Sequence, residues 1–247
     1  MSRWKAAAIH LAISAAIGLV AAILIFGVWY PPPYSQATGA TELVVLLLGV
    51  DLILGPLLTL VVFRSGKKSL RFDLTVIAVL QACAFLYGMS VVVRARPAFI
   101  VGAIDRFVVV GATELDPKDL AAATEPQFRS LPWGGPRVVG LRMPPPGKEH
   151  DDLLFWGLSG KDVGKFPRYY TDYANVAAAL LEKSKSIDSL AQSRAGAAPV
   201  LERWLRQHRR DAPSVRALPM IAPRGDLTML LDSRSGEVLG VVPISAR

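Results

Sequence analysis

Cysteine and histidine are scarce in this sequence of 247 residues, which has one cysteine, Cys83, and three histidines. A single thiol excludes an internal disulfide and any zinc site built from cysteines. The acidic run "EHDD" at 149–152 follows "PPPG", and we expect it to form a solvated turn rather than part of a metal site. The sequence therefore predicts no metal centre.

Motifs for catalysis are missing as well. The stretch "GLSG" around Ser159 lacks the glycine that a G-x-S-x-G nucleophile turn needs two residues after its serine. The stretch "GKDVGK" at 160–165 lacks the spacing of a phosphate-binding loop. Because no set of titratable side chains converges in the pattern, we expect that this protein is not an enzyme.

A basic nucleic-acid-binding face is not evident either, although the formal net charge is +8. Residues 1–96 contain eight basic and three acidic residues, whereas residues 97–247 contain 20 and 17. The excess is thus concentrated beside long apolar runs, and no Lys/Arg stripe marks the remainder of the chain. We expect no binding to nucleic acid.

Three long apolar runs are present, at about 6–30, 43–63 and 74–93. Each has about the 20 residues that cross a bilayer as a helix. The first run is longer than the apolar part of a usual signal peptide, and further runs follow it, so a retained span is favoured over a cleaved signal. We predict a three-helix transmembrane anchor over 1–96, surrounded by membrane lipid.

The orientation of this anchor follows from the basic residues in its flanks. Arg3 and Lys5 precede the first run, and the loop "RSGKKSLRF" between the second and third runs has four basic residues, whereas the loop "PPPYSQATGATE" has none. Arg94 and Arg96 argue for the opposite orientation but are outnumbered. We predict a multi-pass protein of a bacterial inner membrane, with a cytoplasmic N-terminus and a periplasmic C-terminal domain.

Residues 97–247 are enough for one domain of mixed α+β class. The patterns predict strands within 98–111 and around 137–141, and a short helix capped by Asp116 with Pro117 at its first position. They predict further helices within 169–192 and 199–210, and a closing hairpin over 226–244 with Gly236 at the turn.

Asp51 is the unusual residue of the second run, "LLGVDLILGPLLTLVVF" at 47–63. A carboxylate at bilayer depth is unfavourable by roughly 2.5–3.5 kcal/mol. It is tolerated if it faces the bundle and bonds a neighbouring span, where Gln81 and Tyr87 lie at similar depth. Alternatively it contacts a partner or takes part in transport, although one isolated acid makes a poor proton relay.

Gly55 and Pro56 follow Asp51 and are expected to weaken or kink the helix, which is tolerated where neighbours satisfy the freed backbone groups. Small residues are spaced for close helix contact in the first run (Ser14, Gly18, Ala22) and in the third. The pattern is compatible with a self-packed anchor and with a groove for another helix.

Several segments in fixed order carry a family resemblance: "GVDLILGPLLTLVVF", "SLRFDLTVIAVLQ", "RARPAFIV", "DRFVVV" and, near the end, "DLTMLLDSRSGEVLGVV". Together they resemble the TfpX/TfpZ family of type IV pilin accessory proteins, over about 46–110 and 226–242. The resemblance implies a bacterial inner-membrane protein that assists assembly of a particular type IV pilin, without catalysis or cofactor.

Within this resemblance we single out three further places. Arg96 and Pro97 are expected to set the exit from the third span. Asp105 and Arg106 are expected to brace the first strands or to contact a partner, unless they form only a solvated strand edge. The last hairpin is expected to close the domain.

The alternative function is a membrane-anchored sensor or a small transporter subunit with an extracytoplasmic ligand-binding domain. A transporter is expected to have paired broken helices and several intramembrane polar groups, and only one run is broken here. A sensor needs a cytoplasmic output domain, for which the inner face offers a short tail and a nine-residue loop.

Overall fold

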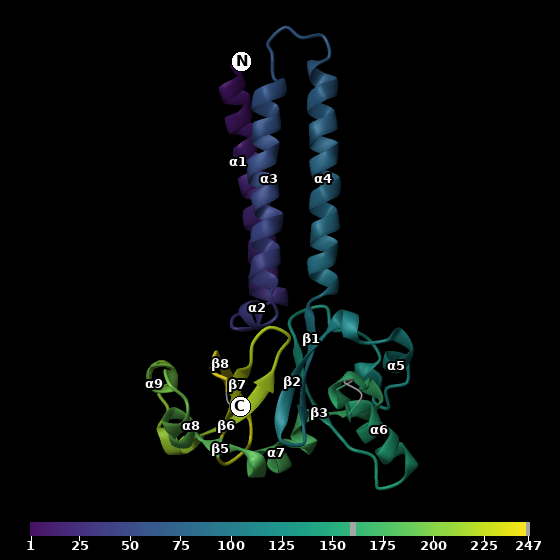
Figure 1. Cartoon of the computed structure of the whole chain (residues 1–247), viewed down its shortest axis with the longest axis vertical. Coiled ribbons are helices and arrows are strands. Elements are labelled where there is room, and N and C mark those ends of the chain that lie inside the picture. The colour runs from purple at the N-terminus through teal and green to yellow at the C-terminus, as the bar shows by residue number, and fades with distance from the viewer. Residues whose placement is uncertain (159–161, 246–247) are drawn as a thin grey trace. The chain divides into compact units, whose positions relative to one another are not determined.

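The protein is described from a computed structural model, in which residues 1–158 and 162–245 are placed. The chain divides into two compact units (Figure 1). The first comprises Met1–Pro31 and Gly39–Ala95, and the second comprises Pro32–Thr38 and Arg96–Arg247. The boundary therefore does not follow a single cut near residue 96, because seven residues between the first two apolar runs belong with the C-terminal part.

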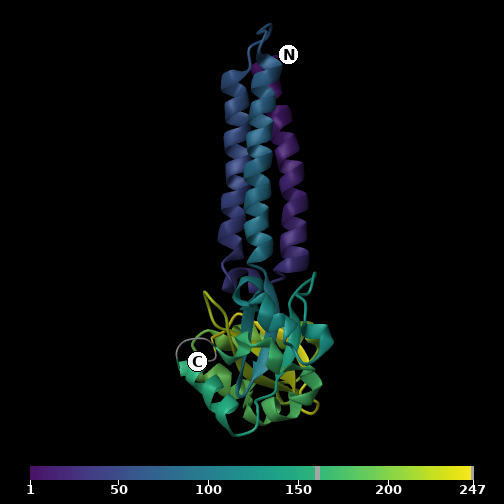
Figure 2. The same ribbon diagram turned by 90° about the vertical axis from the view of Figure 1, so that its right-hand side faces the viewer.

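Three long helices make up the first unit: α1 (Arg3–Leu24), continued by a π-helical turn η1 (Ile25–Trp29), α3 (Ala40–Val62) and α4 (Leu70–Arg94). They lie side by side (Figure 2). Their length and composition suit membrane spans, so the chain is a membrane protein. Each begins three or four residues earlier than its apolar run, because polar residues such as Arg3 and Arg71 continue the helix into the flank.

Small residues bring α1 close to α3. Ser14 and Gly18 of the predicted small-residue face are buried, whereas its third member, Ala22, is half-buried and the neighbouring Ala21 is buried. The side chain of Leu48 on α3 lies 3.2 Å from the position that a Cβ on Gly18 would take. A larger residue at position 18 would therefore push the two helices apart.

Tyr30 closes one end of this bundle. Its side chain is 1 % exposed, and its hydroxyl donates a hydrogen bond of 2.7 Å to the carbonyl of Val92 on α4. A buried hydroxyl needs such a partner, and here the partner is a carbonyl in the last turn of a helix, where the carbonyls have no partner within the helix.

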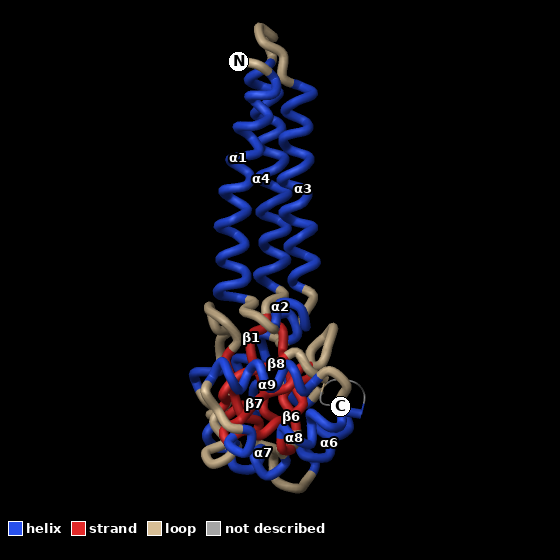
Figure 3. The backbone as a smooth tube through the Cα atoms, turned by 90° about the vertical axis from the view of Figure 1, so that its left-hand side faces the viewer, coloured by secondary structure: helices blue, strands red, loops and turns tan. Residues whose placement is uncertain are grey.

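An eight-stranded mixed sheet organises the second unit (Figure 3). Its strands are β1 (Pro97–Ala103), β2 (Arg106–Gly111), β3 (Arg137–Leu141), β4 (Tyr170–Thr171), β5 (Lys185–Ser186), β6 (Val215–Ile221), β7 (Leu227–Asp232) and β8 (Val238–Val242). The order is β4-β3-β1-β2-β6-β7-β8, with β5 paired to β6. The pairs β1–β3 and β2–β6 are parallel and the others antiparallel.

The predicted strand pair within 98–111 is confirmed as the antiparallel hairpin β1–β2 at the centre of the sheet. Every residue of β1 is buried. Phe99 and Val101 pack into a core on one face, and Ile100 packs into a second core on the other face. The apolar run is continuous rather than alternating because both faces of this hairpin are covered.

Short helices surround the strands: α2 (Tyr34–Ala37), α5 (Pro117–Ala121), α6 (Lys148–Leu158), α7 (Ala177–Lys183), α8 (Ile187–Ser193) and α9 (Ala197–His208). Single turns of 3₁₀ helix connect them: η2 (Ala112–Glu114), η3 (Pro126–Phe128), η4 (Val163–Lys165), η5 (Pro167–Tyr169), η6 (Tyr173–Asn175) and η7 (Ala212–Ser214). Asp116 caps α5 by accepting from the N–H of Lys118, as predicted.

Residues 169–192 are helical only in part, although the sequence favoured one continuous helical segment. They contain β4, then α7 and α8 separated by β5. Arg216 on β6 donates to the carbonyl and the hydroxyl of Ser184, which fixes the chain in an extended conformation there. The Ser186 hydroxyl then accepts from the N–H of Ser189 and starts a new helix. Side-chain hydrogen bonds of this kind compete with helix continuation.

The acidic run 149–152 was also predicted wrongly. It forms the first part of α6 and not a turn. Gly147, with φ of 153°, ends the proline-rich stretch just before the helix. Acidic residues are favourable in a first turn because they face the positive end of the helix dipole. The closing hairpin is confirmed: β7 and β8 pair antiparallel, with Gly236 at φ 72° in the turn.

Candidate functional site

The candidate site lies in the first unit, where Asp51 on α3 meets Gln81 on α4. The amide nitrogen of Gln81 donates to the carboxylate Oδ1 of Asp51 at 3.0 Å and to its backbone carbonyl at 3.3 Å. Among the described residues, Gln81 is the hydrogen-bonding side-chain partner of Asp51. The other predicted neighbour, Tyr87, is 73 % exposed and lines a groove between α3 and α4 that is described below.

Gly55 makes room for this contact. A Cβ on Gly55 would overlap Nε2 of Gln81 and lie 2.6 Å from its Oε1, so the amide occupies the space that a side chain would fill. Gly55 stands one turn after Asp51, on the same face of α3. Pro56 lies inside the helix, which continues to Val62. Asp51, Gly55 and Gln81 are therefore one packing arrangement. The sequence predicted Gln81 or Tyr87 as the neighbour of Asp51, but it did not place Gly55 beside the amide.

Asp51 and Gln81, called the polar pair below, contain more hydrogen-bond acceptors than donors. Both hydrogen bonds of the amide nitrogen of Gln81 go to Asp51, whereas the amide oxygen Oε1 is buried and has no hydrogen-bond partner among the described residues. Buried polar atoms are normally paired, and an unpaired one costs about 1–3 kcal/mol. The pair therefore has unused capacity to accept a hydrogen bond.

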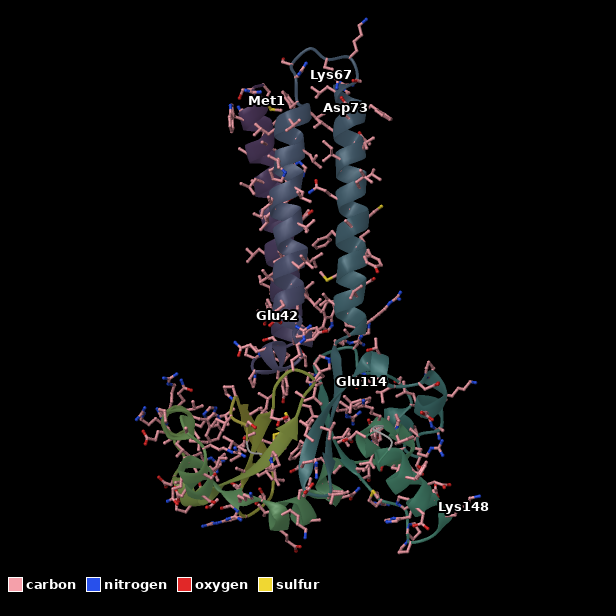
Figure 4. The ribbon with its side chains drawn as sticks, in the orientation of Figure 1. Met1, Glu42, Lys67, Asp73, Glu114 and Lys148 are labelled. Carbon is pink, nitrogen blue, oxygen red and sulfur yellow. The ribbon has the colours of Figure 1, made fainter. Side chains whose placement is uncertain are left out.

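A groove between α3 and α4, with a volume of about 430 Å³, passes this pair. Apart from Asp51, Gln81 and Tyr87, its walls are apolar. The residues that line it are Leu43, Leu46, Leu47, Val50, Asp51, Leu54, Leu58, Leu80, Gln81, Ala84, Phe85, Tyr87, Gly88, Val91 and Val92. Side chains from both helices project into this region (Figure 4).

Polar residues that we did not single out lie in the same spans. Nδ1 of His10 on α1 is 2.6 Å from the hydroxyl of Thr59 on α3, and Ser14 and Thr59 are buried. The sequence signal for this polar contact was a histidine followed one helical turn later by a serine, within an apolar run. It was missed because His10 was counted only as a member of the run.

Beyond the spans, Asp73 near the start of α4 pairs with Lys67 of the α3–α4 loop at 2.6 Å and accepts a hydrogen bond from Ser69 (Figure 4). This ion pair links the loop to α4 and is partly exposed. Exposed pairs of this kind contribute about 0–1 kcal/mol.

Arg96 and Pro97 belong to the second unit. A guanidinium nitrogen of Arg96 donates to the carbonyl of Pro132 at 3.0 Å, and the Arg96 carbonyl accepts from the N–H of Ala112. Pro97 is buried and begins β1. Both residues therefore connect the first strand to neighbouring loops of the sheet domain.

Asp105 and Arg106 pair with each other at the tip of the β1–β2 hairpin, at 2.7 Å and 3.2 Å. This hydrogen bonding raises the pKa of Arg106 above its ordinary value. The preceding residue, Ile104, is 57 % exposed and has φ of 58°. A β-branched residue in this left-handed region is strained, and such strain is concentrated at functional positions. The exposed tip is thus a second place to look for partner contact.

In the described part of the second unit, the titratable side chains of Asp119, Glu149, Asp152, Arg168 and Tyr169 line a cavity of about 290 Å³. Glu149 accepts a hydrogen bond from the hydroxyl of Tyr169 at 2.7 Å, and His150 contacts the carbonyl of Pro144 at 3.0 Å. The described residues contain no cluster of three or more side chains suited to a metal ion. Ser159, considered above for a nucleophile motif, lies outside the described residues.

The fold and this site define a class: a membrane protein with three spans, a polar contact between two of them, and a mixed sheet domain. Residues 1–39 match the family profile described as "Fimbrial assembly protein FimB". The chain is 32 % identical over 192 residues to the "Fimbrial assembly protein, serogroup I" of Dichelobacter nodosus, covering 76 % of this chain and 73 % of that one. The chain belongs to this family of fimbrial assembly proteins.

Two further relatives come from the same organism. The serogroup E1 protein of the same description is 26 % identical over 98 % of this chain and 95 % of its own length. The protein of serogroups C1 and C2 is 34 % identical over 45 % of this chain and 86 % of its own length. No solved structure matches the chain.

Proposed function

We propose that this protein is an inner-membrane accessory factor that assists assembly of a specific type IV pilin, as the resemblance to the TfpX/TfpZ family implies. The observation that carries the proposal is the similarity to a fimbrial assembly protein over 98 % of the chain, which includes the three spans and the sheet domain. Because the similarity covers nearly the whole chain, it favours a shared function of the whole protein over a similarity of the membrane spans alone.

The proposed factor works by contact and without catalysis or cofactor. The spans support a role by contact, because they bury little of their apolar surface against one another. In the most apolar window of α1, α3 and α4, the buried share of residues is 22 %, 17 % and 11 %. Helix faces that remain uncovered within the chain are available to lipid and to the apolar helix of another membrane protein.

Two roles of the polar pair remain distinct in this proposal. In the first, Asp51, Gly55, Pro56 and Gln81 fix the packing of α3 on α4, and the groove along them is only a consequence. In the second, the same residues shape a surface that contacts the pilin in the membrane. The Asp51–Gln81 hydrogen bond supports the first role, and the unused acceptor of Gln81 supports the second.

The periplasmic placement of the sheet domain is part of the proposal. It rests on the basic residues at the N-terminus and in the α3–α4 loop. With that orientation the exposed tip at Ile104–Arg106 and the residues Arg96 and Pro97 lie in the domain that meets the pilin head. Fusions of a reporter that is active only in the periplasm, joined after Lys67 and after Gly225, test the orientation: activity is expected from the second alone.

The proposed function is tested by a clean deletion in the native host. Sheared surface pili and total cellular pilin are compared by immunoblot. Surface pili should fall while pilin persists in the inner membrane, which places the protein at assembly. Loss of both pools would instead assign it to stabilisation of the pilin subunit. No change in either pool would overturn the proposal and favour a sensor or transporter role.

A further inference from the structure

A second cleft runs between α1 and α4 and shares Asp51, Gln81 and Phe85 with the groove described above. One part, of about 300 Å³, is lined by His10, Ser14, Asp51 and Gln81 together with apolar residues. A second part, of about 400 Å³, is lined by residues of α1 from Ala16 to Leu24 and by Phe85 and Met89 of α4. Ile17 and Phe85 line both parts, so the cleft is continuous.

The dimensions of this cleft suit a helix. From His10 to Leu24 along α1 it extends over roughly 21 Å at 1.5 Å per residue. That is most of the thickness of a hydrocarbon core. Since α1 and α4 both pack against α3, one more helix between α1 and α4 would complete a four-helix bundle, in which each helix has two neighbours.

The hydrogen-bond acceptors in the cleft distinguish between a lipid chain and a transmembrane helix as its occupant. Asp51 offers two carboxylate oxygens and Gln81 one amide oxygen, and the N–H groups of that amide are already used on Asp51. Between Val44 and Met89, Lys and Arg occur only in the α3–α4 loop and at Arg71 in the first turn of α4, so no cationic donor lies at the depth of Asp51 and Gln81. A lipid chain cannot supply a donor, whereas a helix with one polar side chain can.

We propose that the α1–α4 cleft binds a transmembrane helix of another protein, and that this helix presents a hydrogen-bond donor to the Asp51–Gln81 pair. The inference rests on the proposed function in taking the occupant to be a client protein. It adds the binding face and the chemical feature by which the client is selected. A small rotation of the Gln81 amide brings its oxygen to the incoming donor, while Asp51 accepts a second hydrogen bond.

The test uses the full chain in phosphatidylcholine vesicles and two synthetic transmembrane peptides. Both are leucine–alanine helices, identical except for one central residue, which is asparagine in the first and leucine in the second. Binding is measured by energy transfer to a fluorophore on Cys83, the single cysteine, which is exposed and lines none of the grooves described here. The asparagine peptide should bind about three- to tenfold more tightly.

The double substitution Asp51→Leu with Gln81→Leu is the matched variant. It replaces both partners by apolar groups, which avoids leaving one of them unpaired. The preference for the asparagine peptide should then disappear while the leucine peptide binds as before. Equal binding of the two peptides by the unaltered protein, or an unchanged preference in the double variant, would refute the inference.

The position of the peptide is tested by disulfide cross-linking to a cysteine in the peptide. Met89→Cys in a Cys83→Ser background places a thiol in the cleft and outside the α3–α4 groove, and the unaltered Cys83 is the control on the same helix. The cross-link should form from position 89 and not from position 83. Equal yields, or cross-linked dimers of the protein itself, would overturn the cleft as a client site. If pili still depend on the protein in that case, the proposed function stands without this site.

Discussion

The strand β1 and the helix α4 are both apolar, yet the chain uses them in opposite ways. All seven residues of β1 are buried, on both faces of a sheet. In the most apolar window of α4 only 11 % of the residues are buried, and Phe72, Leu80, Leu86 and Tyr87 are between 64 % and 73 % exposed. Apolar content alone thus does not distinguish a core from a surface. The difference lies in what covers the residues: protein in one case, lipid or another helix in the other.

The comparison is tested most strongly by removing one large side chain from each region. Phe99 is fully buried and its ring lies edge-on to Phe128 and Tyr170, with centroids 6.4 Å and 5.2 Å away. Phe99→Ala should lower the unfolding free energy of the sheet domain by about 3–5 kcal/mol. Leu80→Ala on α4 should have almost no effect, because that side chain is 64 % exposed.

Thermal unfolding of the full chain in detergent, followed by near-ultraviolet circular dichroism, measures both variants. A large loss of stability in Leu80→Ala would mean that α4 is covered within the chain after all, and the contrast between the regions would fail.

The second prediction concerns the closing hairpin. Gly236 has φ of 72°, and a Cβ there would lie 2.9 Å from the carbonyl oxygen of Ala177. Gly236→Ala should destabilise the domain by about 2 kcal/mol, from backbone strain and the contact with rigid backbone. Gly225→Ala is the control, since that glycine has open space around it and lies outside the left-handed region. Equal urea midpoints for the two variants would contradict the assigned turn.

The third prediction compares two glycine-to-alanine substitutions within the spans, one at a crowded position and one at an open position. Gly55→Ala should displace the Gln81 amide and break its hydrogen bonds to Asp51, with a loss of about 1 kcal/mol in the association of α3 with α4. Gly49→Ala on the same helix meets no atom within 4 Å and should be neutral. Protease cleavage in the α3–α4 loop, measured against rising detergent concentration, reports the difference. Identical cleavage of both variants would show that the polar pair does not hold these helices together.

The smallest expected effect is a pH dependence in the sheet domain. Hydrogen bonds from the N–H groups of Arg234 and Ser235, and then from Arg210, hold the pKa of Asp232 at about 2, below its ordinary value of 3.8. Because the folded pKa is the lower one, the stabilising contribution is complete above about pH 4 and is lost as the pH falls through 2.

Asp232→Asn removes this charge while its side-chain oxygen still accepts from the backbone. The gap in unfolding free energy between the unaltered protein and the variant should narrow between pH 4 and 2. A gap that stays constant over that range would exclude a lowered pKa. The site is partly exposed, so the change is expected to be small.

Structural features that depend on residues close together in the chain were predicted from the sequence, whereas features that depend on distant contacts were not. The spans, the β1–β2 pair, the Asp116 cap and the Gly236 turn depend on neighbouring residues, and they were predicted. The break between α7 and α8 depends on Arg216, which is 32 residues from Ser184 in the chain. The burial of Tyr30 depends on Val92, which is 62 residues away. Neither contact leaves a local pattern.

The candidate site shows the same division. Asp51 stood out because its charge conflicts with the apolar run around it. Gln81 was placed at similar depth by counting residues from the span centres. The role of Gly55 was not predictable, because it depends on which side of α3 faces the Gln81 amide. Ile104 was missed because an unfavourable backbone conformation is visible only in three dimensions.

The segment Pro32–Thr38 has a consequence for how the protein is made and handled. It belongs to the sheet domain: Ala37 is part of a core, its carbonyl accepts from the N–H of Arg224, and burial raises the pKa of Tyr34 to about 12. The ribosome releases this piece two spans before the rest of the domain, so the domain cannot finish folding until the last span has been inserted. A fragment beginning at residue 97 would lack part of its own interior, and a secreted version should have residues 32–38 joined to it.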